Sequence, residues 1–170
     1  MPRLGLSLPL PSSFQTLRFF GNGPQESYWD RKTGCLVGYY EQTVAQQLFP
    51  YVKPQESGNH TGIRAIALEN GRVGLMAVGL DMELEASALP YAPEDLFAAR
   101  HRNELTPRKN VFLNLDLHQR GLGTRSCGED TVEECRLHAG SHRLSFRLFP
   151  YPAGLSQPDW MKLARQLQRP

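Results

Sequence analysis

The sequence lacks several features that would assign it to a familiar functional class. Its 170 residues contain no apolar run of about 18 residues, the length that indicates a membrane-spanning helix. Lysine and arginine do not gather into one block, and the net charge is only +2, so we expect no binding to nucleic acid or to a membrane. No Gly-Lys-Ser/Thr follows a glycine-rich stretch, which excludes the usual phosphate-binding loop.

Cysteine is also scarce, with three residues at Cys35, Cys127 and Cys135. The odd count argues against a disulfide framework, and the spacings match no zinc pattern. We therefore expect reduced thiols in a cytoplasmic protein, with no metal site and no cofactor in this chain.

The N-terminal segment lacks the continuous apolar core that a secretory signal peptide requires. Pro2, Pro9 and Pro11 interrupt it, and no continuous apolar core follows its single basic residue, Arg3. Leucines instead occupy every second position from 4 to 10, and this alternation favours a β-strand.

What the chain does contain is 15 glycines and 13 prolines that separate short runs of alternating apolar residues. Its length suits one domain, and its 40% hydrophobic and 21% charged residues are ordinary for a globular protein. Strands at this spacing predict an all-β, antiparallel β-sandwich. We expect the strands at residues 4–10, 16–20, 36–47, 63–68, 73–80, 110–118 and 144–149.

One or two short helices complete the expected fold. Residues 92–100 begin with a proline and acidic residues and end with Arg100, an arrangement that suits the helix dipole. Residues 158–167 form either a second short helix or a frayed tail. We accordingly divide the chain into a sandwich domain, residues 1–155, and a C-terminal tail, residues 156–170.

The first polar block, residues 21–31, combines two glycines and a proline with amide, carboxylate and aromatic side chains. Such groups bind sugar hydroxyls and ring faces. The alternative, which we favour, is a structural turn in which Asp30 and Arg31 pair locally.

The second block, residues 51–62, contains His60 close to an amide and a carboxylate. A histidine there can act as a general acid or base, because its unperturbed pKa is near 6.5. We favour the simpler interpretation of a solvated loop residue.

The third block, residues 116–128, is a strand that runs into a glycine-rich loop. Gly121 and Gly123 let the backbone approach a ligand or a neighbouring chain closely. Cys127 is a nucleophile only if a base lies nearby, and the sequence identifies none. A glycosidase needs two carboxylates about 5 to 10 Å apart, and spacing alone selects no such pair here.

Three segments carry a resemblance to a known family. FFGNGPQESYWDRK (19–32), YVKPQESGNHTGIR (51–64) and LNLDLHQRGLGTRSCGED (113–130) resemble, in this order, the C-terminal domain of the large bacterial β-galactosidases of glycoside hydrolase family 2. A closing strand at residues 142–147 adds to the likeness, which extends from about residue 3 to 151.

The resemblance implies a galactose-mutarotase-like supersandwich, of which this chain covers only the later part. It also implies a retaining β-galactosidase whose two catalytic glutamates lie on a separate TIM barrel, together with its magnesium and sodium ions. This chain would then hold no catalytic residue and be inactive alone. Its partners would be the rest of the enzyme chain or a large subunit, and a galactoside, in a homo-oligomeric enzyme.

The same resemblance selects a loop as the substrate-binding region. In the family, the loop after the third segment's strand reaches over the active-site mouth, and many members carry a tryptophan there that stacks on the outer sugar. The matching position here is Cys127, so we expect Gly123, Arg125, Ser126 and Cys127 to form the outer-subsite loop. Because cysteine offers little face for stacking, outer-subsite binding should be weaker.

Two other functions stay open on the sequence alone. A free-standing carbohydrate-binding module would require exposed aromatic residues such as Tyr28, Trp29 or Trp160 on one face. A galactose mutarotase would require a general acid and base, for which His60 or His118 with a carboxylate are the available groups.

Overall fold

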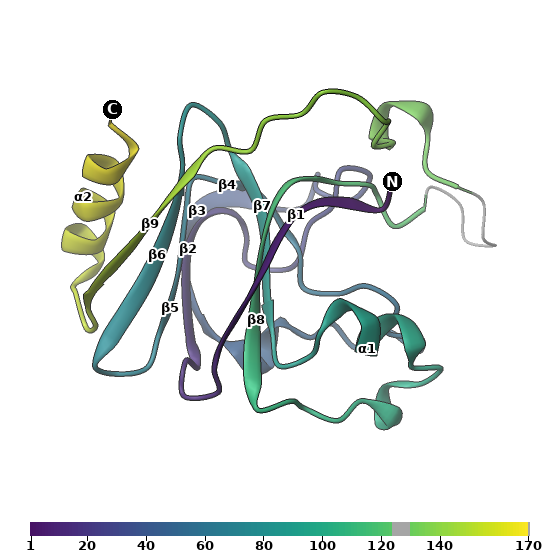
Figure 1. Ribbon diagram of the computed structural model, residues 1–170, viewed down its shortest axis with the longest axis horizontal. Coiled ribbons are helices and arrows are strands. Elements are labelled where there is room, and N and C mark those ends of the chain that lie inside the picture. The colour runs from purple at the N-terminus through teal and green to yellow at the C-terminus, as the bar shows by residue number, and fades with distance from the viewer. Residues whose placement is uncertain (124–129, 170) are drawn as a thin grey trace.

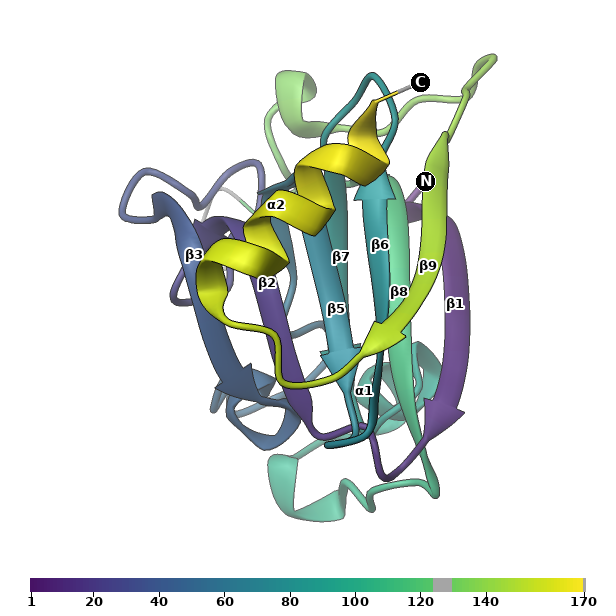
Figure 2. The ribbon, with the colours of Figure 1, turned by 90° about the vertical axis from the view of Figure 1, so that its left-hand side faces the viewer.

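The alternating runs of the sequence form two antiparallel sheets that pack face to face (Figures 1 and 2). The structure is a computed structural model that describes residues 1–123 and 130–169. Within these ranges the expected all-β sandwich with short helices is confirmed. The four-stranded sheet has the order β1 (Arg3–Pro11), β8 (Asn110–Gln119), β7 (Leu84–Leu89) and β4 (His60–Ile63). The five-stranded sheet has the order β3 (Leu36–Thr43), β2 (Thr16–Gly23), β5 (Ala65–Glu69), β6 (Val73–Gly79) and β9 (Phe146–Pro152).

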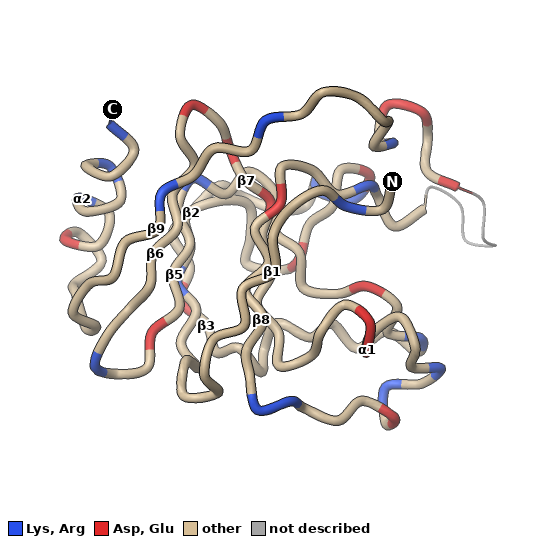
Figure 3. Tube along the Cα trace, viewed as in Figure 1, with Lys and Arg blue, Asp and Glu red and all other residues tan. Residues whose placement is uncertain are grey.

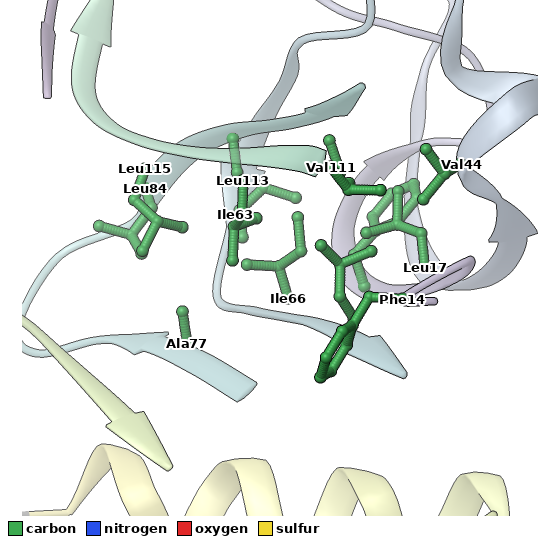
Figure 4. Packing of buried hydrophobic residues seen from close by; sticks show 14 residues of the cluster. Phe14, Leu17, Val44, Ile63, Ile66, Ala77, Leu84, Val111, Leu113 and Leu115 are labelled. Carbon is green, nitrogen blue, oxygen red and sulfur yellow. The ribbon is translucent and has the colours of Figure 1, made fainter. Parts of the chain in front are cut away.

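The main core fills the space between the two sheets (Figure 4). Alternate side chains of each strand point inward, as the period of two requires. Burial of each large apolar side chain contributes about 1.5–3 kcal/mol to stability. Fully buried members of this cluster include Leu17, Phe19, Ile63, Ile66, Leu84, Leu113 and Leu115.

Two of the expected strands are not single strands in the structure, and the strand expected at residues 144–149 is β9, Phe146–Pro152. The run at residues 36–47 ends as a strand at Thr43 and continues as the 3₁₀ helix η1 (Val44–Gln47). The side chain of Gln46 accepts a hydrogen bond from the Thr43 amide at 2.7 Å, which fixes this turn. The run at residues 63–68 divides at Arg64, because β4 belongs to one sheet and β5 to the other.

The strands β4 and β7 do not follow from the sequence pattern. All six residues of β7 are buried, and although apolar and polar residues alternate from Leu84 to Ser87, alanine and glutamate are uncommon in strands. The strand β4 has only four residues, and its pairing with β7 is irregular between His60 and Ile63.

The helices lie on opposite sides of the sandwich (Figure 1). The first expected helix is α1 (Pro93–Ala98), where the Asp95 carboxylate accepts a hydrogen bond from the Ala92 amide at 2.9 Å. The 3₁₀ turns η2 (Arg102–Glu104) and η3 (Glu133–Cys135) lie in later loops. The second expected helix is α2 (Gln157–Gln168). Ser156 is its N-cap, and the Ser156 hydroxyl accepts a hydrogen bond from the Asp159 amide at 3.3 Å.

The helix α2 covers the outer face of the five-stranded sheet (Figure 2). Trp160 is fully buried there, and its indole N–H donates to the Tyr151 hydroxyl at 3.0 Å. Tyr151 in turn donates to Glu69 at 2.6 Å, and Glu69 pairs with Arg18 at 2.9 Å. This chain of contacts joins the helix to β9, β5 and β2. Among the described residues, no helix has the length and apolar character needed to cross a membrane.

Candidate functional site

The two faces of the four-stranded sheet differ in polarity. The inner face packs against the hydrophobic core, and the outer face carries buried polar side chains. On β7, Leu84 and Ala86 point into the core, whereas Glu85 between them points outward. On β8, Asp116 lies directly opposite Glu85 in the sheet register. We call this region the polar layer, and it comprises Arg3, Glu26, Glu56, Asn59, Glu85, Asp116 and His118. Figure 3 shows acidic and basic residues side by side near the start of β1 and in the adjacent loops.

Glu85 is the centre of the polar layer, with 3% of its surface exposed. Its carboxylate accepts hydrogen bonds from the Asn59 side-chain amide at 3.0 Å and from the Gln119 backbone amide at 3.2 Å. The Trp29 indole N–H also donates to it, and Nδ1 of His118 lies 3.0 Å from the same carboxylate. A buried carboxylate is tolerated only with such partners, so Glu85 ties two loops to β8.

A second buried carboxylate, Asp116, holds the edge strand β1 in place. Its carboxylate accepts from both Nε and Nη2 of Arg3, with the Nε distance at 3.3 Å. Arg3 also lies 3.8 Å from Glu56. Burial raises the pKa of Asp116 and of Glu56, and in both cases the Arg3 guanidinium opposes the shift.

The first polar block folds into this layer, but not through the pairing that the sequence suggested. Arg31 pairs with Glu26 and not with Asp30. Glu26 is buried and also accepts from the Gly58 amide at 2.6 Å and from the Tyr51 hydroxyl. The block is therefore joined through Glu26 to the loop at residues 51–58.

Asp30 has a different role, because it holds the glycine-rich loop that follows β8. Its two carboxylate oxygens accept from the backbone amides of Leu122 at 3.1 Å and Gly123 at 2.8 Å. A Cβ at Gly121 would lie 2.2 Å from Cγ of Asp30, so a larger residue there would displace this carboxylate. Gly123 has a φ of 129°, a conformation that side chains disfavour. Asp30 thus fixes where the loop begins.

The predicted substrate-binding loop is described only at this starting point. Gly123 lies at the base of the loop in contact with Asp30. The other three predicted residues, Arg125, Ser126 and Cys127, lie outside the described residues. No local sequence pattern connects Asp30 with this loop, because 93 positions separate Asp30 from Gly123.

Trp29 is the aromatic residue that the polar layer presents to solvent, with 42% of its surface exposed. Its ring lies 4.9 Å from the His118 ring, and the Lys32 ammonium lies 3.7 Å from the ring centre. The hydrogen bond to Glu85 fixes its indole edge. A surface hollow of 370 Å³ is lined by Asp30 and Lys32 and by other residues of the 25–35 loop, with Phe49.

His60 is not the solvated loop residue that the sequence suggested. It lies on β4 with 1% of its surface exposed, and its Nε2 lies 2.8 Å from the Gln47 side-chain oxygen. Burial lowers the pKa of His60 to about 4, so the imidazole is neutral at pH 7. Its position beside Phe19 in the core gives it a structural role.

The thiols and acidic groups of the described ranges offer little for metal binding. Cys35 and Cys135 are free thiols. In residues 1–123 and 130–169, no three His, Cys, Asp or Glu side chains are grouped as metal ligands.

Comparison with known proteins identifies the family. The family model described as the β-galactosidase small chain matches residues 1–148, and the chain therefore belongs to this family. It is 40% identical over 143 residues to a β-galactosidase of Lactobacillus delbrueckii subsp. bulgaricus. The matched region is 84% of this chain and 14% of that protein. It is 37% identical over 125 residues to a β-galactosidase of Priestia megaterium. The matched region is 72% of this chain and 12% of that protein. A Streptococcus thermophilus β-galactosidase is 35% identical over 156 residues, or 88% of this chain and 15% of that protein. The chain thus spans only a small part of its curated relatives.

Proposed function

We propose that this chain is the C-terminal, accessory part of a retaining β-galactosidase that releases terminal β-D-galactose from lactose-like galactosides. In this proposal it completes the sugar pocket and takes part in subunit packing, while the catalytic glutamates lie on a TIM barrel elsewhere. The observation that carries the pocket role is the arrangement of Trp29 and Asp30. An exposed aromatic ring and the anchor of the glycine-rich loop lie on adjacent residues above the polar layer.

The state of the carboxylates supports an inactive isolated chain. A retaining glycosidase needs two accessible carboxyl groups about 5 Å apart. Glu56 of the polar layer is partly exposed beside Arg3, whereas Glu26, Glu85 and Asp116 are each at most 6% exposed. Each also accepts several hydrogen bonds from the protein itself, which leaves these carboxylates committed to structure.

The surface around Trp29 supports contact with a sugar. Aromatic faces pack against the C–H faces of sugars, and nearby polar groups orient the hydroxyls. His118 is partly exposed beside the indole, and the Lys32 ammonium lies over its ring. These groups supply polar contacts close to the indole.

The expected cofactors belong to the other part of the enzyme. We propose that the magnesium and sodium ions that the resemblance implies are bound in the barrel. We expect the complete enzyme to be a cytoplasmic homo-oligomer, in which this chain is joined to, or associated with, the catalytic part.

Complementation tests the proposed function. The chain would be mixed with a matching β-galactosidase that lacks this region, and release of nitrophenol from nitrophenyl galactoside would be followed. We expect activity in the mixture and none from this chain alone. A mixture of two folded components without activity would contradict the proposal, as would hydrolysis by this chain alone.

The exposure of Trp29 favours a second candidate, a stand-alone carbohydrate-binding module. Because Trp160 is fully buried, Trp29 is the tryptophan whose fluorescence a sugar would change. Titration of the isolated chain with galactose or lactose separates the two functions. Saturable binding without complementation would support the module, and no response at millimolar sugar would exclude it.

A further inference from the structure

The sheet edges of the sandwich differ in how they are protected against pairing with another strand. An edge strand presents unpaired N–H and C=O groups, and natural proteins block such edges with prolines, charges, bulges or covering segments. Among the described residues, one sheet ends at β1 and β4 and the other ends at β3 and β9. Figure 2 shows β3 and β9 at opposite sides of the five-stranded sheet.

Two of the four edges carry the same protection, a pair of prolines two residues apart. On β1 the pair is Pro9 and Pro11, and on β9 it is Pro150 and Pro152. Residues two apart in an antiparallel strand direct their amide positions to the same side. Since proline has no N–H and both strands pair with their inner neighbours, the missing donors lie on the open side.

The edge strand β4 is protected in another way. It has only four residues, and His60, Thr61 and Ile63 are each at most 2% exposed. Its pairing with β7 is irregular, and Gly62 has a φ of 64°. A short, bent and buried strand offers no template for a further strand.

The remaining edge, β3, has none of these protections. It has eight residues without proline, and Leu36 and Val37 are 73% and 58% exposed. The Val44 amide bonds the Gln15 carbonyl at 2.9 Å, which places the even-numbered amides of β3 toward β2. The amides and carbonyls of Val37, Tyr39 and Glu41 therefore point to the open side.

The single charged side chain of β3 does not guard the edge either. Glu41 lies 3.2 Å from the Arg18 guanidinium and accepts from the Tyr39 hydroxyl at 3.0 Å. Both contacts direct its carboxylate over the face of the sheet that α2 covers. Among the described residues, no backbone hydrogen bond from a loop is formed with Val37, Tyr39 or Glu41.

We propose that the open edge of β3 receives a strand from the remainder of the β-galactosidase, so that the five-stranded sheet continues into the catalytic part. This inference rests on the proposed function. The relatives that match this chain are several times longer, since it covers 12–15% of their length in the three cases described. The incoming segment would be extended and would carry apolar side chains on both faces beside Leu36 and Val37.

Two matched proline variants test this assignment. Val37→Pro removes one outward N–H from β3. Leu148→Pro removes the corresponding outward N–H from β9, and the Leu148 side chain is 39% exposed. In the complementation assay we expect Val37→Pro to raise the concentration for half-maximal activity at least about tenfold, and Leu148→Pro to change it less than about twofold. Val37→Lys, which keeps the backbone donor but adds an edge charge, should also weaken association, and circular dichroism would verify folding of all three.

Hydrogen exchange gives an independent measurement on the unmodified chain. The amides of Val37, Tyr39 and Glu41 should exchange rapidly in the chain alone and become protected by at least about a hundredfold in the mixture. Protection of these amides in the chain alone, at the same concentration, would identify a second copy as the occupant and overturn the proposal.

The outcomes separate this inference from the proposed function. An active mixture in which all the β3 variants associate normally would leave the function standing and overturn the β3 assignment. Stronger weakening by Leu148→Pro would assign the contact to β9 instead and also overturn it. Absence of activity with the unmodified chain would contradict both proposals.

Discussion

The two outer faces of the sandwich are covered in opposite ways. The five-stranded sheet is covered by the helix α2, which contributes Trp160, Ala164 and Leu167 to an apolar cluster. The four-stranded sheet is covered by the short helix α1 and by loops that bury several polar side chains, with Glu85 and Asp116 beneath them. The first face gains stability from apolar burial. The outer face of the four-stranded sheet gains little net free energy from its buried ion pairs. These ion pairs instead hold the loops in position.

This difference suggests a division of roles within one small domain. Buried polar networks define one arrangement of their members, because any misplaced group is left without a partner. The face with the network is also where Trp29 is exposed and where Asp30 holds the glycine-rich loop. Stability should therefore respond most to changes on the α2 face, and activity to changes on the polar-layer face.

The largest loss of stability is expected from Trp160→Ala. The indole is fully buried between α2 and the sheet, and such truncations cost about 3–5 kcal/mol. The free energy of unfolding would be measured by urea titration. Phe97→Ala on α1, where the side chain is 72% exposed, is the control and should change it by less than about 0.5 kcal/mol. A loss below about 1 kcal/mol for Trp160→Ala would show that α2 adds little stability.

The buried imidazole of His60 on β4 should make the stability of the chain depend on pH. The folded pKa of His60 is about 4 against an ordinary value of 6.5. The imidazole therefore favours the folded state fully above pH 6.5, and this contribution is lost as the pH falls to about 4. The loss amounts to about 3 kcal/mol.

Asp116 and Glu56 act in the opposite direction, because their folded pKa values are raised. Their protonation favours the folded state at low pH, and this contribution is lost as the pH rises through their folded pKa values. The His60→Gln variant separates the two effects, since it removes only the imidazole. Its stability, measured from pH 7 to pH 4, should fall less than that of the unmodified chain, and equal slopes would contradict the account.

A smaller loss is expected from Glu85→Gln in the polar layer. The amide has nearly the same shape, but its NH₂ group would face donors that now bind a carboxylate oxygen. We expect a loss of about 2 kcal/mol. Glu83→Gln, two residues away and paired with Arg64 at the surface, should cost less than about 0.5 kcal/mol by the same urea titration. Equal losses for the two variants would remove the special role of Glu85.

The smallest effect on stability, with a clear effect on activity, is expected from Asp30→Asn. The side chain is partly exposed, so unfolding should become easier by less than about 1 kcal/mol. One of the two loop amides, however, would lose its acceptor. In the reconstituted enzyme the KM for nitrophenyl galactoside should rise about tenfold, which corresponds to ~1.4 kcal/mol. Exposed Glu94 supplies the control, Glu94→Gln, which should leave KM unchanged.

Much of the sandwich follows from the sequence, because strands with one buried face leave an alternating pattern. The strands β1 and β8 are examples, and their predicted positions differ from the structure by one residue at most at each end. The strand β7 was missed although Leu84 to Ser87 alternate, because alanine and glutamate are uncommon in strands. The 3₁₀ turn that begins at Val44 was also missed, because over four residues such a turn and the end of a strand have similar sequence patterns.

The candidate site was harder to predict, because its contacts join residues far apart in the chain. Glu85 collects hydrogen bonds from Trp29, Asn59 and Gln119, which are 56, 26 and 34 positions away. No local spacing reveals such a centre. The burial of His60 has the same origin, since a single histidine between polar neighbours carries no signal of the strand that encloses it.

Kinetics of a Trp29→Ala variant in the reconstituted enzyme test the central claim most directly. The claim is that the polar-layer face, and not the α2 face, meets the sugar. We predict that Trp29→Ala raises the KM for nitrophenyl galactoside about tenfold and leaves kcat within about twofold, because the lost contact is a binding contact. Lys162→Ala on α2 should change neither value. An unchanged KM for Trp29→Ala, in a mixture of full activity, would contradict the claim.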